Sequence, residues 1–222
     1  MSNQDGLFCF PGCPCSAALQ PGNWRHPSHQ ITYLALHDTA IVIIMMGKSS
    51  QTSFQRKNIR LPAEDYVGRR MYFLTLCFEG RKPFGKIPRV ASWLIERLRA
   101  HAADCGFFVH AYCMMPDHMH ALVCAASEAS DLIAFVEEYK QQTGFAFAQR
   151  TRRKLWQFKY YDRILRNSDS AEAVAWYAWL NPVRKGLCRT PLEYPFVGSF
   201  TEIGARILKG SEAPAWKPPW KA

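Results

Sequence analysis

Two histidines close together in the chain are the first candidates for chemistry. His118 and His120 follow the dipeptide Pro116-Asp117 and open an apolar stretch that ends at Cys124. Residues i and i+2 of a β-strand point to the same face, so this spacing places two imidazoles side by side. Such a pair suits a divalent metal ion, but two core histidines bonded to backbone would show the same pattern. The pair is therefore a candidate metal site that needs further support.

A tyrosine and an asparagine form the second candidate group. Tyr177 and Asn181 lie four residues apart at the end of a helix expected over residues 171–180, and are therefore near-neighbours on one face. A metal held by the histidine pair and an oxygen of Asn181 could polarise a scissile phosphate. Tyr177 could then attack phosphorus and conserve the bond energy as a phosphotyrosine. Three other tyrosines compete as nucleophiles on chemistry alone: Tyr139, Tyr160 and Tyr161.

Residues 150–166 are the most basic segment of the chain. Asp162 is the single acid among seven cations, and aromatic residues are interleaved with them. Cations can bind the phosphates of a nucleic acid, and neighbouring aromatic rings can stack on its bases. This combination is typical of single-strand binding. The predicted nucleic-acid-binding residues are Arg150, Arg152, Arg153, Lys154, Trp156, Lys159, Tyr160, Arg163 and Arg166. The alternative is a charged surface turn whose aromatic residues point into the core.

The composition agrees with a nucleic-acid partner. The 222 residues carry a net charge of +10, which favours a polyanion, nucleic acid before an anionic membrane. A hydrophobic content of 48% can bury a core. The eight cysteines are scattered as reduced thiols would be, and no apolar run reaches the roughly 18 residues that span a bilayer. Without a secretory signal pattern, we expect a cytoplasmic protein with no membrane association.

The hydrophobic pattern predicts an α+β domain over residues 58–200. Strands and helices are expected in the order strand, helix, strand, strand, helix, strand, which is the split pattern of a ferredoxin-like fold. We therefore expect an antiparallel sheet with helices on one face. The expected ranges are 71–78, 90–103, 107–114, 118–124, 131–148 and, for the last strand, 155–161. Residues 191–199 are expected to pack back on the domain as an extended segment.

Both ends of the chain fall outside this pattern. Residues 1–57 are expected to be a poorly ordered extension, or an over-long reading of the gene with Met45 or Met46 as the true start. A zinc site there is conceivable, but its spacing matches no paired Cys-x-x-Cys pattern. Its ligands would be Cys9, Cys13, Cys15 and either His26 or His29. Residues 201–222 are expected to be a loose tail.

Four segments together resemble a known family. In order they are Tyr-Phe-Leu-Thr-Leu at 72–76, Met-Met-Pro-Asp-His-Met-His at 114–120, the segment 156–167, and Tyr-Ala-Trp-Leu-Asn-Pro-Val-Arg-Lys-Gly-Leu at 177–187. With them, residues from about 60 to 200 resemble the IS200/IS605-type Y1 transposases of the HUH superfamily. The nearest branch is that of the REP-associated tyrosine transposases.

The resemblance implies a Mg²⁺- or Mn²⁺-dependent enzyme that cleaves and rejoins hairpin-bearing single-stranded DNA. It assigns His118, His120 and Asn181 as metal ligands and Tyr177 as the nucleophile, with a 5′-phosphotyrosine and a free 3′-OH as products. The DNA would be palindromic repeats, and the protein a monomer or homodimer. Two other functions remain open: a non-catalytic hairpin-binding domain with a decayed site, and a phosphodiesterase that uses activated water.

Overall fold

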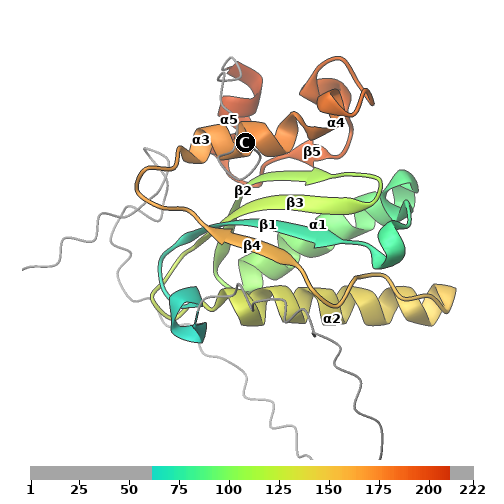
Figure 1. Cartoon of the computed structure of the whole chain (residues 1–222), viewed down its shortest axis with the longest axis horizontal. Coiled ribbons are helices and arrows are strands. Elements are labelled where there is room, and N and C mark those ends of the chain that lie inside the picture. The colour runs from blue at the N-terminus through green and yellow to red at the C-terminus, as the bar shows by residue number, and fades with distance from the viewer. Residues whose placement is uncertain (1–61, 211–222) are drawn as a thin grey trace, which may run out of the picture. The chain divides into compact units, whose positions relative to one another are not determined.

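A five-stranded antiparallel sheet forms the centre of the molecule (Figure 1). The computed structural model describes residues 62–210. The strand order is β4-β1-β3-β2-β5, and each neighbouring pair is antiparallel. The strands are β1 (Met71–Cys77), β2 (Phe107–Met114), β3 (His118–Ala125), β4 (Tyr161–Ile164) and β5 (Val197–Gly198).

Helices lie on both faces of this sheet (Figure 1). One face packs against α1 (Pro88–Asp104) and α2 (Leu132–Thr151); the other packs against α3 (Ala171–Trp179) and α5 (Glu202–Gly210). The short α4 (Asn181–Arg184) follows α3 directly. Single 3₁₀ turns complete the fold: η2 (Ala63–Tyr66), η3 (Glu79–Arg81), η4 (Phe84–Lys86) and η5 (Pro191–Glu193).

The order from β1 to β4 confirms the predicted ferredoxin-like α+β fold. The expected one-sided helical layer holds for α1 and α2. The second layer, with α3 and α5, covers the opposite face, because α3 is too apolar to lie in solvent: every residue from Ala173 to Trp179 is buried. The domain is therefore three layers thick, with a separate core on each side of the sheet.

Alternation along β3 separates these two cores. Met119 and Ala121 belong to the core beneath α1 and α2, whereas Leu122 and Cys124 belong to the core beneath α3. Seven of the eight residues of β3 are buried, as expected of a central strand covered on both faces. A register slip of one residue would exchange the two sets, so burial on both sides specifies the pairing strongly.

The helices begin where their sequences predict. The Asp131 carboxylate caps α2 by accepting hydrogen bonds from the backbone N–H groups of Ile133 (2.7 Å) and Ala134 (3.1 Å). The Ser170 hydroxyl caps α3 through the Ala173 N–H at 3.1 Å. Each cap satisfies backbone donors that the helix itself leaves unpaired, and contributes about 1 kcal/mol.

The last strand of the ferredoxin-like unit differs from the prediction. It was expected over 155–161, but β4 spans Tyr161–Ile164. Leu155 and Trp156 are instead buried in the core, and Trp156 makes only a single bridge to Phe78. Apolar residues of an irregular segment that insert into the core produce the same local hydrophobic pattern as a buried strand, which explains the wrong bounds.

The C-terminal part is also more ordered than expected. The predicted loose tail began at residue 201, yet α5 continues to Gly210 and buries Leu208 in the core beneath α3. The segment 191–199 packs back as predicted, although its first residues form η5 and are not extended. It supplies β5, which pairs with Cys113 and Tyr112 of β2. The N-terminal extension and its candidate zinc ligands lie outside the described residues.

Between residues 62 and 210, no helix is both long and apolar enough to cross a membrane.

Gly85 is the position where the fold should be most sensitive to one added methyl group. A Cβ at Gly85 would overlap the Met115 carbonyl oxygen, whereas a Cβ at Gly144 in α2 would meet the Trp156 ring at an ordinary 3.7 Å. We expect Gly85→Ala to lower the free energy of unfolding by about 1–3 kcal/mol. Gly144→Ala should raise it by about 0.5–1 kcal/mol, because alanine favours a helix. Urea unfolding of both variants measures the difference, and equal stabilities would contradict this packing.

Candidate metal and tyrosine site

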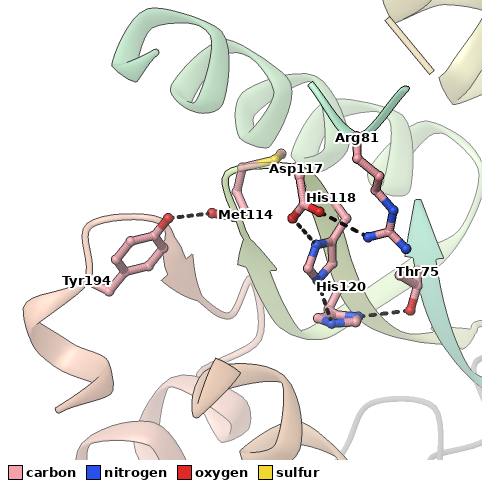
Figure 2. Close-up of polar contacts among 7 residues, drawn as sticks. All are labelled: Thr75, Arg81, Met114, Asp117, His118, His120 and Tyr194. Atoms are coloured by element: carbon pink, nitrogen blue, oxygen red, sulfur yellow. Dashed lines mark hydrogen bonds and ion pairs between the residues drawn. The ribbon is translucent and has the colours of Figure 1, made fainter. Parts of the chain in front are cut away.

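The turn that carries the histidines is held from both sides. The Gly85 N–H donates to the Pro116 carbonyl at 2.9 Å, which fastens the turn to η4. The Tyr194 hydroxyl donates to the Met114 carbonyl at 3.0 Å, which fastens the end of β2 to the C-terminal segment (Figure 2). Two distant parts of the chain thus fix the start of β3, where His118 stands.

The two imidazoles point their Nε2 atoms at each other. These atoms lie 3.0 Å apart, and the ring planes are nearly perpendicular at 81°. Each Nδ1 has its own partner: His118 Nδ1 donates to Asp117 Oδ1 at 2.6 Å, and His120 Nδ1 lies 2.9 Å from Thr75 Oγ1 (Figure 2). A carboxylate only accepts, so the neutral His118 carries its proton on Nδ1 and presents a lone pair at Nε2.

This geometry fits a divalent cation. Two facing lone pairs at 3.0 Å repel unless a proton or a cation lies between them. Two ring nitrogens 3.0 Å apart are close enough to bind the same ion. Ligand histidines commonly engage the other ring nitrogen with a carboxylate or another polar group, as Asp117 and Thr75 do here. The two imidazoles and their supports are therefore suited to hold a divalent ion together with oxygen ligands.

The electrostatics favour a neutral His118 beside an ionised Asp117. Burial lowers the pKa of His118, against the opposing effect of its hydrogen bond with Asp117. Burial alone would raise the pKa of Asp117, but its bonds with His118 and with Arg81, at 3.2 Å, outweigh burial and lower the pKa. At neutral pH His118 is thus an uncharged imidazole beside an ionised carboxylate.

Tyr177 lies next to this pair within the same chain. Its ring centroid is 6.0 Å from that of His120, and both rings contact Phe73, at 5.7 Å for Tyr177 and 5.2 Å for His120. Phe73 of β1 therefore seats the tyrosine of α3 against the histidine of β3. Only 5% of Tyr177 is exposed.

Asn181 contacts Tyr177 in a different way from the one expected. The predicted helix stops at Trp179, and α4 starts at Asn181. The Asn181 amide group donates to the carbonyls of Tyr177 (2.9 Å) and Ala178 (3.4 Å), which bridges the two helices. Carbonyls accept only from the amide nitrogen, so the Asn181 oxygen is the atom left for a ligand. Its role as third ligand stays a prediction.

Arg184 is a site residue that the sequence reasoning missed. Its guanidinium lies over the Tyr177 ring, 4.5 Å from the centroid, and donates to the Tyr177 carbonyl. The sequence signal was only its place in the Asn-Pro-Val-Arg stretch. The break between α3 and α4 is what turns Arg184 back over the tyrosine, and it places a positive charge beside the phenol.

The structure separates the competing tyrosines. Tyr139 is buried in the core beneath α1 and α2, and its hydroxyl donates to the Leu94 carbonyl at 2.9 Å. Tyr160 packs on that same face, beneath the ammonium of Lys140 at 5.1 Å. Neither shares a sheet face with the histidines. Tyr161 does, and it is considered below.

The basic segment exposes fewer of the predicted nucleic-acid-binding residues than expected. Trp156 is wrong as a stacking residue: it is 4% exposed, stacks on Phe78 at 4.9 Å and donates to Thr143 Oγ1 at 2.9 Å. Tyr160 is partly buried, and Arg163 binds both carboxylate oxygens of Asp169. The predicted cations that are exposed are Arg150, Arg152, Arg153, Lys154, Lys159 and Arg166, of which Lys154 pairs with Glu79 at 3.1 Å. The exposed aromatics of the segment are Phe158 and Tyr161.

A second group of possible ligands lies between α1 and α2. Ligand atoms of His101, Cys105 and Glu138 lie within 4.8 Å of one another. However, Cys105 Sγ is 3.7 Å from both ring nitrogens of His101, so it lies off the lone-pair axis of either one. His101 Nε2 is already bonded to the Phe135 carbonyl at 2.8 Å. This arrangement fits a metal less well than the His118–His120 pair does.

Fold and site together define a class of protein: an antiparallel α+β domain whose central strand presents a His-x-His pair to a tyrosine on a covering helix. The family described as "Transposase IS200 like" matches residues 67–178, half of the chain, and the chain belongs to this family. The match contains both histidines and Tyr177; Asn181 lies just beyond it.

Two relatives agree with this family. A REP-associated tyrosine transposase of Escherichia coli is 25% identical over 93 residues, which cover 42% of this chain and 54% of the relative. The chain thus matches about half the length of that protein. A solved structure of a REP-associated tyrosine transposase bound to a REP hairpin has 21% identity and a TM-score of 0.52, and the match covers 60% of this chain and 78% of that one. This second likeness confirms the fold.

Thr75 offers a direct test of the histidine pair as a metal site. Thr75→Val removes the hydroxyl that orients His120 and nearly preserves the shape of the side chain. We expect Mn²⁺ to bind about 10- to 100-fold more weakly, the usual effect of losing such a support. Calorimetric titration with Mn²⁺ measures it, with Thr151→Val, on α2, as the matched control. Wild-type affinity in the Thr75 variant would contradict the assignment.

Proposed function

We propose that this protein is a divalent-metal-dependent enzyme that cleaves and rejoins hairpin-bearing single-stranded DNA through a 5′-phosphotyrosine at Tyr177. The observation that carries the proposal is the placement of the Tyr177 ring beside His120, whose Nε2 faces that of His118 at 3.0 Å. A metal-ligand pair next to a phenol suits phosphoryl transfer better than it suits binding alone.

In the first step, the Tyr177 oxygen attacks the scissile phosphorus. A bond forms between this oxygen and phosphorus, the bond from phosphorus to the 3′ oxygen breaks, and the phenol proton is released as the 3′ oxygen becomes a hydroxyl. The phosphate remains on tyrosine as a diester. A 3′-OH of the same or another strand can then attack it, which restores the tyrosine and joins the DNA without hydrolysis.

His118, His120 and the Asn181 oxygen would hold Mg²⁺ or Mn²⁺, which would supply Lewis-acid polarisation of the scissile phosphate. Asp117 and Thr75 keep the two rings oriented. Arg184 holds a positive charge over the Tyr177 ring, which favours the phenolate character that develops in both steps.

The proposed substrate is a DNA hairpin with unpaired flanks. The solved relative is described as bound to a REP hairpin, and this chain combines the same fold with exposed cations along residues 150–166. Such cations meet phosphates without regard to sequence, which suits a folded strand. Palindromic repeats near the gene are the first oligonucleotides to test.

Tyr177→Phe is the main test of the chemistry. We expect it to abolish covalent protein–DNA adducts, while hairpin affinity and the urea unfolding midpoint stay close to wild type, because only the attacking oxygen is lost. Denaturing gels with labelled hairpins and Mn²⁺ detect the adduct. Adducts that persist in this variant would overturn the Tyr177 assignment.

The same experiment separates the other two functions. Cutting that survives Tyr177→Phe and never yields an adduct would identify a phosphodiesterase that uses water. Metal-independent binding, with no nicking by the wild-type protein at any metal concentration, would identify a binding domain. His120→Ala removes a proposed metal ligand. It should stop cutting whether the enzyme uses Tyr177 or activated water as the nucleophile.

We also propose that one protomer suffices for catalysis, because Tyr177 contacts Phe73 and His120 of its own chain. Mixing two inactive variants, His120→Ala and Tyr177→Phe, tests this directly. A site completed within one chain predicts that the mixture stays inactive. Recovery of cleavage on mixing would show that the histidines and the tyrosine come from different protomers.

A further inference from the structure

Tyr161 stands in line with the metal-site histidine across the sheet. In β4 it pairs with Thr75 of β1, and Thr75 in turn pairs with His120 of β3. Residues opposite one another in antiparallel strands share a face. The contact of Thr75 Oγ1 with His120 Nδ1 confirms that shared face for the second pair. Tyr161, Thr75 and His120 therefore form one row on the side covered by α3.

The neighbours of Tyr161 confirm this orientation. Tyr160 and Ile164 pack against the opposite core, beneath α1 and α2, as the alternation of a strand requires. Tyr161 itself remains 49% exposed at the edge strand of the sheet, whereas Tyr177 further along the same face is buried. The row thus runs from an open edge to the proposed metal ligand.

The distance along this row suits a polynucleotide. Two strand spacings separate the backbones of Tyr161 and His120, which amounts to about 10 Å. A strand whose phosphate lies at His120 would bring a neighbouring base over the edge of the sheet. The charge there is complementary to DNA, because Lys159 is exposed and the surrounding segment 150–166 holds seven cations and one acid.

We infer that the Tyr161 ring is the platform on which an unpaired base next to the scissile phosphate stacks, so that it sets which phosphate reaches Tyr177. This inference rests on the proposed function, since it assumes that the phosphate lies at the histidine pair. The role belongs to the ring and not to the hydroxyl, because stacking needs only a π-face. Tyr161 thus takes the stacking role that the sequence assigned to Trp156 and Tyr160, both of which pack against the core beneath α1 and α2.

Photocrosslinking tests the contact independently of cleavage. The full-length protein is mixed with a DNA hairpin whose single-stranded flanks carry 5-iodouracil at one position at a time, irradiated, and mapped by mass spectrometry. We expect one flank position to crosslink to residue 161 in the wild type and in Tyr161→Phe. Crosslinks that map only to other residues, with none at 161, would overturn the inference.

Affinity and cleavage pattern give the functional readout. Tyr161→Ala should weaken binding of the flanked hairpin about ten- to hundredfold, the range of one base–aromatic stack, and spread cleavage over neighbouring phosphates. Tyr161→Phe should retain wild-type affinity and a single cleavage position. Phe145→Ala is the matched control, because Phe145 is 67% exposed on α2, which covers the other face of the sheet. Wild-type affinity and cleavage pattern in Tyr161→Ala would overturn the inference.

Three further outcomes separate this inference from its alternatives and from the proposed function. If Tyr161→Phe loses the covalent adduct while Tyr177→Phe keeps it, Tyr161 is the nucleophile and both assignments fail. If the protein dimerises without DNA and Tyr161→Ala abolishes the dimer, the edge strand binds a second copy instead, and the inference fails. If crosslinking maps to residue 161 but no protein cleaves, the stacking role stands and the proposed chemistry fails.

Discussion

The antiparallel pairing of β1 with β3 is the constraint on which the site depends. This register sets Thr75 opposite His120 and Cys77 opposite His118, so that both imidazoles stand on the face covered by α3. Moving β3 by one residue would turn Met119 toward that face and bury the imidazoles beneath α1 and α2. Because β3 is buried on both sides, the cost of such a slip is the loss of two hydrophobic cores at once.

The second helical layer converts this sheet into a candidate active site. A ferredoxin-like sheet alone would leave this face uncovered, whereas α3 brings Tyr177 against His120 and against the Phe73 ring of β1. The break between α3 and α4 then places Asn181 and Arg184 at the end of the tyrosine helix. α5 packs into the same core as α3, and the Tyr194 hydroxyl ties the C-terminal segment to the end of β2.

Charged groups flank both the His118 imidazole and the Tyr177 ring. Asp117 is shared by His118 and Arg81, so the carboxylate stays ionised while the buried imidazole stays unprotonated. Arg184 places a positive charge over the Tyr177 ring. An uncharged His118 and a cation over the tyrosine suit an anionic substrate, because they add no negative charge that would oppose a phosphate.

The sequence by itself determined the order of strands and helices from β1 to α2, but not the bounds of β4 or the presence of α5. Period-two alternation predicted that His118 and His120 share a face, and their register with β1 agrees. Only the tertiary structure decided which aromatics of residues 150–166 are exposed, because this segment is irregular and Trp156 inserts into a core built by distant residues. It also decided that Arg184 lies over Tyr177 and that Tyr161 shares a row with His120. Local periodicity encodes the face of a residue within its own element, whereas these contacts join elements far apart in the chain.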